Sequence, residues 1–116
     1  MIKNVSKNKI IIKNHKIADN MFSRAKGLMF SKKSAFDYGL IFDLERDTRI
    51  GASIHMFFVF FPINIVFLDS KKRVVDVKIK LMPFRATKPK RKCRYVIELP
   101  IKYDKRYVSI GDQFSW

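Results

Sequence analysis

The sequence predicts an all-β protein, a compact β-sandwich or barrel-like domain of about seven short strands with one short α-helix. Three observations support this prediction. Residues 50–68 form an apolar run rich in Phe, Ile and Val, which favour strands. Residues 75–81 alternate between apolar and polar side chains, and turn-forming residues separate most apolar runs. The 116 residues are enough for one domain, residues 1–116, with a core of its own.

The apolar run carries no charged side chain between Arg49 and Asp69, so we expect the core to form around it. Its 19 residues approach the length of a membrane-spanning helix, which needs about 20 and is the alternative interpretation. Pro62 and Asn64 near its middle favour two consecutive strands that meet at the proline. In the second strand, residues 63–68, both faces are largely apolar, which predicts a central strand covered on both sides.

The remaining elements follow from turn and cap signals. Asp19 or Asn20 can cap a short helix over residues 21–26, which Gly27 would end in the left-handed conformation. The polar turn at residues 69–72 predicts a hairpin between the strands on either side. The other expected strands are residues 7–13, 38–42, 73–81, 95–99 and 107–110, with a charged turn at 45–49 and an irregular basic segment at 83–92.

The net charge of +15 is the strongest compositional signal and favours a polyanionic partner. Residues 71–94 hold eleven of the 25 basic residues but one of the ten acidic ones, so the charge is concentrated. Basic side chains beside aromatic ones suit a nucleic acid backbone with stacked bases. We therefore expect a basic patch that binds nucleic acid or another polyanion; the alternative is a solvated, merely solubilising loop. Its expected binding residues are Lys78, Lys80, Phe84, Arg85, Lys88, Lys90, Arg91, Lys92 and Arg94.

Two other functions stay open. His55 and Asn64 fall in successive predicted strands, and with Arg24 they would line a pocket for a small ligand or substrate. The alternative for His55 is a buried ring hydrogen-bonded to a backbone carbonyl, and Arg24 would otherwise tie the helix to a sheet edge. The third possibility is that Phe57–Phe61 forms a protein–protein surface.

No pattern points to catalysis, and we expect a non-enzymatic protein without cofactor. Two histidines and one cysteine show no metal-ligand spacing. Cys93 lacks a motif for a partner base and is expected to be an incidental surface thiol, while Glu98 is expected to pair with a basic side chain. A single cysteine and the lack of a signal-peptide core near residue 1 favour the cytoplasm. The sequence does not define the oligomeric state.

Several short motifs occur in a family-like order. They are Arg24–Met29 (RAKGLM), Gly39–Phe42 (GLIF), Phe61–Asp69 (FPINIVFLD), Tyr95–Leu99 (YVIEL) and Gly111–Asp112. Over about residues 17–112, the chain resembles the family known as domain of unknown function 192. The resemblance implies a compact β-sandwich with one short helix and implies no activity. Where many bacterial members have a polar Trp-Met-Lys-Asn-Thr run, this chain has His55–Val59 (HMFFV), which looks like the archaeal branch.

Overall fold

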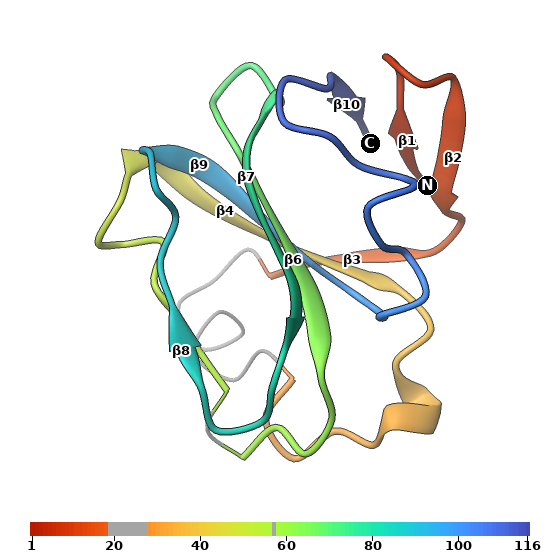
Figure 1. Cartoon of the computed structure of the whole chain (residues 1–116), viewed down its shortest axis with the longest axis vertical. Helices are drawn as coiled ribbons and strands as arrows, with labels where there is room; N and C mark the ends of the chain where they lie inside the picture. Colours follow the sequence, from red (N-terminus) through yellow and green to blue (C-terminus); the bar gives the residue numbers. More distant parts are fainter. Residues whose placement is uncertain (19–27, 57) are drawn as a thin grey trace.

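The computed structural model describes residues 1–18, 28–56 and 58–116, and these form ten strands and one 3-10 helix, η1 (Figure 1). In chain order the elements are β1 Ile2–Asn4, β2 Lys9–Ile12, β3 His15–Ala18, η1 Lys33–Ala35, β4 Gly39–Thr48, β5 Ile54–His55, β6 Ile63–Leu68, β7 Val74–Leu81, β8 Ala86–Thr87, β9 Cys93–Leu99 and β10 Phe114–Ser115. The all-β prediction is confirmed.

A five-stranded sheet with the order β3-β4-β9-β6-β7 forms the centre of the molecule. β3 runs parallel to β4, and the other neighbours are antiparallel. All six residues of β6 are buried, and their side chains alternate between two core clusters. Ile65 and Phe67 belong to one cluster, whereas Val66 and Leu68 belong to the other. The prediction of a central strand covered on both faces is therefore confirmed, as is the hairpin that joins β6 to β7.

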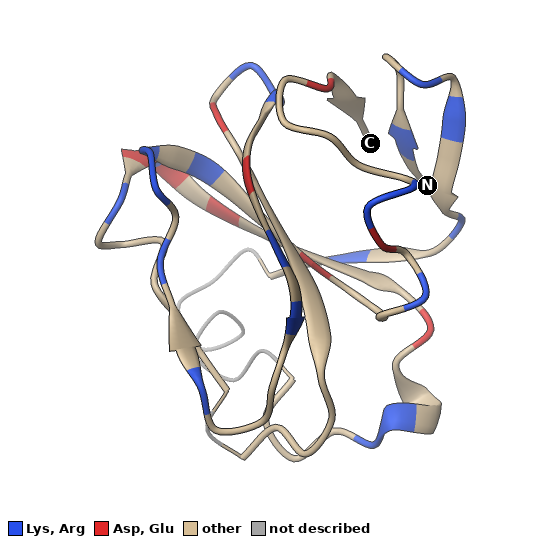
Figure 2. Cartoon of the chain, in the orientation of Figure 1, with Lys and Arg blue, Asp and Glu red and all other residues tan. Residues whose placement is uncertain are grey.

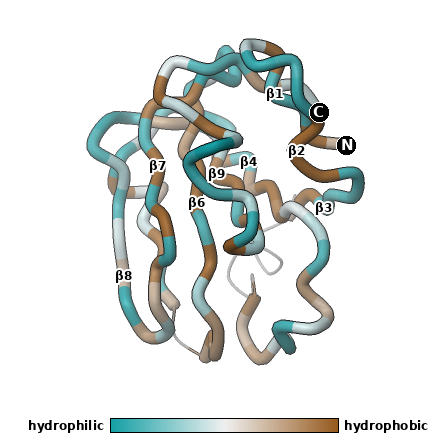
Figure 3. The backbone as a smooth tube through the Cα atoms, turned by 45° about the vertical axis from the view of Figure 1, so that its right-hand side comes forward, coloured by the Kyte–Doolittle hydropathy of each residue, from teal (hydrophilic) through white to brown (hydrophobic). Residues whose placement is uncertain are grey.

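Different structures cover the two faces of this sheet. A three-stranded sheet, β10-β1-β2, brings Ile2, Ile12 and Phe114 against the face that carries Val66. Gly39 marks the closest approach, because a Cβ atom there would lie 2.5 Å from Ile2 Cδ1. Residues of the loops that flank η1 and β5 pack on the opposite face. In Figure 3 a hydrophilic stretch interrupts the hydrophobic colour of β6, and that colour returns in the loop before the strand.

Several predicted boundaries are wrong for identifiable reasons. The expected charged turn at residues 45–49 belongs largely to β4, because that strand pairs with β9 as far as Thr48 opposite Cys93. A bulged register and the positive φ of Glu45 (67°) interrupt the ladder between them. Residues 107–110 are not a strand: the Ser109 N–H donates to the Asp112 carboxylate, and the last strand is β10.

The N-terminal region and the first half of the apolar run also differ from the prediction. Two strands, β1 and β3, flank the expected first strand, and the run before Pro62 supplies only the two-residue β5. β5 pairs with β8, and β8 lies within residues 83–92, the segment that was predicted to be irregular. The predicted helix at residues 21–26 lies outside the described residues. Among the residues that are described, no helix is long and apolar enough to cross a membrane.

Candidate functional site

The basic segment at residues 71–94 is less uniformly positive in the fold than in the sequence. Pairing of β4 with β9 places Asp43 opposite Tyr95, and Arg94 binds the Asp43 carboxylate through Nε and Nη2 at 3.0 and 3.2 Å. This hydrogen bond raises the pKa of Arg94, to which Asp47 also contributes. Figure 2 shows the acidic part of β4 beside the basic part of β9. Arg94 is therefore engaged by an acidic partner.

Asp76 of β7 offsets a second part of the segment. The alternation of residues 75–81 places Asp76 among the polar side chains, on the face expected to meet solvent, but the residue is 3% exposed. Its carboxylate accepts hydrogen bonds from the Val77 and Lys90 backbone N–H groups and lies 3.5 Å from Lys78 Nζ. Asp76 thus attaches the loop before β9 to β7, and the charge of Lys78 is partly used within the fold. The sequence prediction treated both as surface features.

The other predicted polyanion-binding side chains lie on the surface. None of them forms an ion pair with another described residue. They are Lys80, Phe84, Arg85, Lys88, Lys90, Arg91 and Lys92, all exposed. Lys80 belongs to β7, and Phe84, Arg85 and Lys88 lie in the loops on either side of β8. Lys90–Lys92 lie in the loop that Asp76 holds. The predicted patch therefore has two parts with different electrostatic surroundings.

An aromatic cluster that the sequence analysis recognised only in part lies next to the first of these parts. It consists of Phe30, Phe58, Phe60 and Phe84, which are 67%, 47%, 61% and 51% exposed. The rings of Phe30 and Phe58 are stacked with centroids 4.9 Å apart, and Phe84 makes edge contacts with Phe58 at 6.4 Å and Phe60 at 5.6 Å. Four exposed phenylalanine rings that these three contacts join in a row indicate an interaction site more strongly than scattered apolar residues do.

The backbone under this cluster is also unusual. Phe30, Phe58 and Phe84 have φ values of 61°, 58° and 62°, in the left-handed region that non-glycine residues avoid. The Phe30 N–H donates to Phe58 O at 2.8 Å, and the Phe84 N–H donates to Met56 O at 2.9 Å. These bonds join three loops that are distant in sequence. Such strain costs about 1–3 kcal/mol per residue and concentrates at functional sites.

The three segments that carry the cluster contain basic side chains and no acidic ones. Residues 28–36, 54–61 and 80–88 include no Asp or Glu. We call their cations the basic rim: Lys32, Lys33, Lys80, Arg85 and Lys88. All five are exposed, and Figure 2 shows the blue segments at the lower end of β8 and at η1. The result is an aromatic surface with a positively charged edge.

The structure describes two of the three residues of the alternative pocket, which consists of Arg24, His55 and Asn64. Asn64 is buried; its amide donates to Ile101 O (3.2 Å) and Tyr103 O (2.8 Å), and its Oδ1 accepts from the Lys80 N–H (2.8 Å). These bonds use the polar atoms of Asn64 structurally. His55 is exposed on β5 and is not the buried histidine of the alternative interpretation. Arg24 lies outside the described residues.

Two buried titratable groups, the Cys93 thiol and the Glu98 carboxyl, have raised pKa values. Cys93 is fully buried, contrary to the expected surface thiol, and burial raises the pKa of its thiol to about 12. Glu98 is 5% exposed, its Oε1 has no hydrogen-bond partner among the described residues, and burial raises its pKa to about 8. The expected salt bridge of Glu98 is therefore absent from the described part of the chain. In that part, no group of three or more His, Cys, Asp or Glu side chains could hold a metal ion.

Together, the fold and the surface define a small, basic all-β protein with an exposed aromatic cluster. The chain belongs to the family described as DUF192, uncharacterized ACR, whose model matches residues 2–116. Archaeal relatives include the UPF0127 protein PH1112 of Pyrococcus horikoshii, 44% identical over 117 residues that cover 100% of this chain and 98% of the relative. A UPF0127 protein of Thermococcus sibiricus is 41% identical over 100% of this chain and 74% of its own length.

A solved structure supports the fold as well. A protein of unknown function from Novosphingobium aromaticivorans superimposes with a TM-score of 0.78 and 23% sequence identity. The match covers 88% of this chain and 74% of that one. The family is uncharacterised.

Proposed function

We propose that this protein is a non-enzymatic binding module that holds single-stranded nucleic acid on the aromatic cluster and basic rim. The observation that carries the proposal is the exposure of four contacting phenylalanine rings, three of them on left-handed backbone, among segments with five cations and no acid. Neither burial nor backbone preference accounts for phenylalanine at these positions. A ligand that binds to the exposed rings would account for phenylalanine at these positions.

Single-stranded nucleic acid fits both halves of this surface. Unpaired bases stack on exposed aromatic rings regardless of sequence, at about 1–3 kcal/mol per base, while phosphates pair with Lys and Arg. Bases within a duplex are already stacked on each other, so the rings would gain little from double-stranded DNA. The net charge of +15 would add a general attraction for polyanions. We therefore place the centre of the predicted polyanion site at Phe84, Arg85 and Lys88, and not at Lys90–Arg94.

The test is fluorescence anisotropy with labelled single-stranded RNA and DNA of about 12 nucleotides, duplex DNA and heparin, at two salt concentrations. Phe60→Ala with Phe84→Ala should weaken single-strand binding by roughly tenfold or more, because the substitutions remove a stacking platform. Ile110→Ala is the matched control, since Ile110 is 69% exposed and lies outside the three segments that carry the cluster.

A second pair of variants tests the charge. Arg85→Gln with Lys88→Gln should reduce the slope of log affinity against log salt by about 0.7 for each phosphate that the variant no longer binds. Lys13→Gln with Lys105→Gln removes the same charge from exposed positions elsewhere and should leave the slope almost unchanged.

Two outcomes would overturn the proposal. One is the absence of single-strand binding at low salt; the other is binding that the phenylalanine variant retains as fully as the Ile110→Ala control does. If the wild type instead self-associates and the phenylalanine variant is monomeric by light scattering, the surface is a protein–protein interface.

A further inference from the structure

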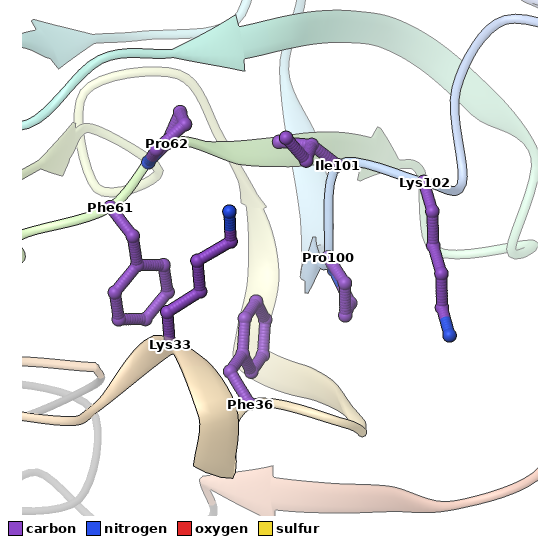
Figure 4. A pocket seen from close by; sticks show the side chains of 7 residues that line it. All are labelled: Lys33, Phe36, Phe61, Pro62, Pro100, Ile101 and Lys102. Carbon is purple, nitrogen blue, oxygen red and sulfur yellow. The ribbon is translucent and has the colours of Figure 1, made fainter.

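A second potential site lies beside η1, between the start of β6 and the end of β9. It is a pocket of about 340 Å³, within the range typical of small-ligand sites. Its lining residues are Lys33, Phe36, Phe61, Pro62, Pro100, Ile101 and Lys102. Five of the seven are apolar, two are cationic and none is acidic. Figure 4 shows the Phe36 and Phe61 rings on one side of the space and Pro100 and Ile101 on the other.

The walls of the pocket are held in place before any ligand binds. Phe36 and Phe61 are 6% and 4% exposed, belong to the core cluster, and contact each other at a centroid distance of 5.7 Å. Pro62 directly precedes β6 and Pro100 directly follows β9, and each proline ring restricts the backbone there. A pocket with rigid walls loses little conformational entropy when it is filled, which favours binding.

The 3-10 helix explains the position of one lysine. Side chains at i and i+3 eclipse in a 3-10 turn, so Lys33 and Phe36 emerge on the same side of η1. The Phe36 N–H donates to Lys33 O at 3.1 Å, which fixes this turn. In Figure 4 the Lys33 side chain rises toward Pro62 across the pocket, and Lys102 extends along its outer edge. Neither ammonium group forms an ion pair with a described residue.

From this arrangement we infer that the pocket binds a small molecule with an aromatic or branched apolar body and one anionic group. The apolar body lies between Phe36, Phe61 and Ile101, and the anion is paired with Lys33, with Lys102 at the rim. A carboxylate and a phosphate monoester present the same chemistry to an ammonium group, and the experiment distinguishes them. The pocket shares Lys33 with the basic rim, but its apolar walls, Phe36, Phe61 and Ile101, are not part of the aromatic cluster.

The experiment is an amide chemical-shift titration of the isotopically labelled full chain. The probes are phenylacetate, phenyl phosphate, the neutral phenylacetamide, and acetate with inorganic phosphate as anions that lack the apolar body. We expect phenylacetate or phenyl phosphate to shift the amide resonances of Phe36, Phe61, Ile101 and Lys102. The Kd should be on the order of 1 mM, as for a fragment-sized ligand. Whichever of these two probes binds more tightly identifies the preferred anionic group. Phenylacetamide, acetate and inorganic phosphate should bind at least fivefold more weakly than that probe.

Three variants connect the signal to the pocket. Ile101→Trp fills the space and should abolish the shifts, and Lys33→Gln should weaken binding about fivefold. Lys105 is an exposed lysine outside the pocket, so Lys105→Gln should change neither the chemical shifts nor the affinity. Ile101→Trp should leave single-strand binding unaffected, so failure of this inference is distinguishable from failure of the proposed function. No shifts at the pocket with any probe, or equal binding by Ile101→Trp, would overturn the inference.

Discussion

Replacement of Glu98 by glutamine should raise the free energy of unfolding relative to the wild type, and this difference should grow as the pH rises. Glu98 lies on β9 between Leu40 of β4 and Ile65 of β6, and its Oε1 has no partner among the described residues. Burial raises its pKa from the ordinary 4.5 to about 8, so the carboxyl group is protonated in the folded protein at neutral pH. In the unfolded chain the same group is ionised above its ordinary pKa.

The sign and size of the effect follow from this difference. Between the two pKa values the folded state binds one more proton than the unfolded state, so the free energy of unfolding falls as the pH rises. Each pH unit in this window costs about 1.4 kcal/mol, which gives about 3 kcal/mol between about pH 5 and pH 7.5. Below pH 4.5 both states are protonated and the effect vanishes; above about pH 8 it is constant.

Urea unfolding of wild type and Glu98→Gln at about pH 5, 6.3 and 7.5 measures the effect. Glutamine is neutral throughout, so the difference in free energy of unfolding should grow in favour of the variant by about 3 kcal/mol across the series. His15, whose pKa burial lowers, titrates in both proteins and cancels in the difference. Glu45→Gln, at an exposed position, is the control and should show no such trend. A difference for Glu98→Gln that does not change with pH would refute the reasoning and indicate a cationic partner for the carboxylate.

Three further predictions test other buried or strained groups. Cys93 should react with a thiol reagent only when the protein unfolds, because the thiol is buried and its raised pKa of about 12 suppresses the thiolate; rapid labelling under native conditions would contradict this. Asn64→Ala should lower the free energy of unfolding by about 3 kcal/mol, because it leaves three backbone groups without their partner; a loss below about 1 kcal/mol would mean that they find other partners. Phe84→Gly should change stability by no more than about 1 kcal/mol, because relief of the left-handed backbone offsets the removal of the ring. The buried Phe61→Ala should cost about 3–5 kcal/mol in the same assay, and an equal loss for Phe84→Gly would make the aromatic cluster structural.

The strands that were predicted correctly are those with a strong local pattern. β6, β7 and β9 lie where apolar runs, alternation and the polar turn at residues 69–72 predict them. A buried strand between two core clusters needs apolar residues on both faces, and residues 63–68 have them. Strands of two residues such as β5 and β8 carry no periodic signal, because their pairing is imposed by the loops that meet there.

The candidate site was predicted only in part for a similar reason. Phe84, Arg85 and Lys88 belong to a segment whose composition already indicated a polyanion site. Phe30 was missed, since it follows a buried residue and a half-buried one in a turn and nothing local distinguishes it from a core side chain. Its place in the aromatic cluster becomes visible only through the ring contact with Phe58 and the backbone hydrogen bond that joins their loops.

The sequence by itself determined the all-β class, the central buried strand, the excess of positive charge and the family. These properties depend on composition and on patterns within a few residues, which local sterics and burial translate directly into structure. Only the tertiary structure decided that Asp43 and Asp76 offset part of the basic segment, and that three loops combine their phenylalanines beside exposed cations. Such contacts join residues far apart in the chain, and strand register and loop closure, which no local pattern encodes, bring them together.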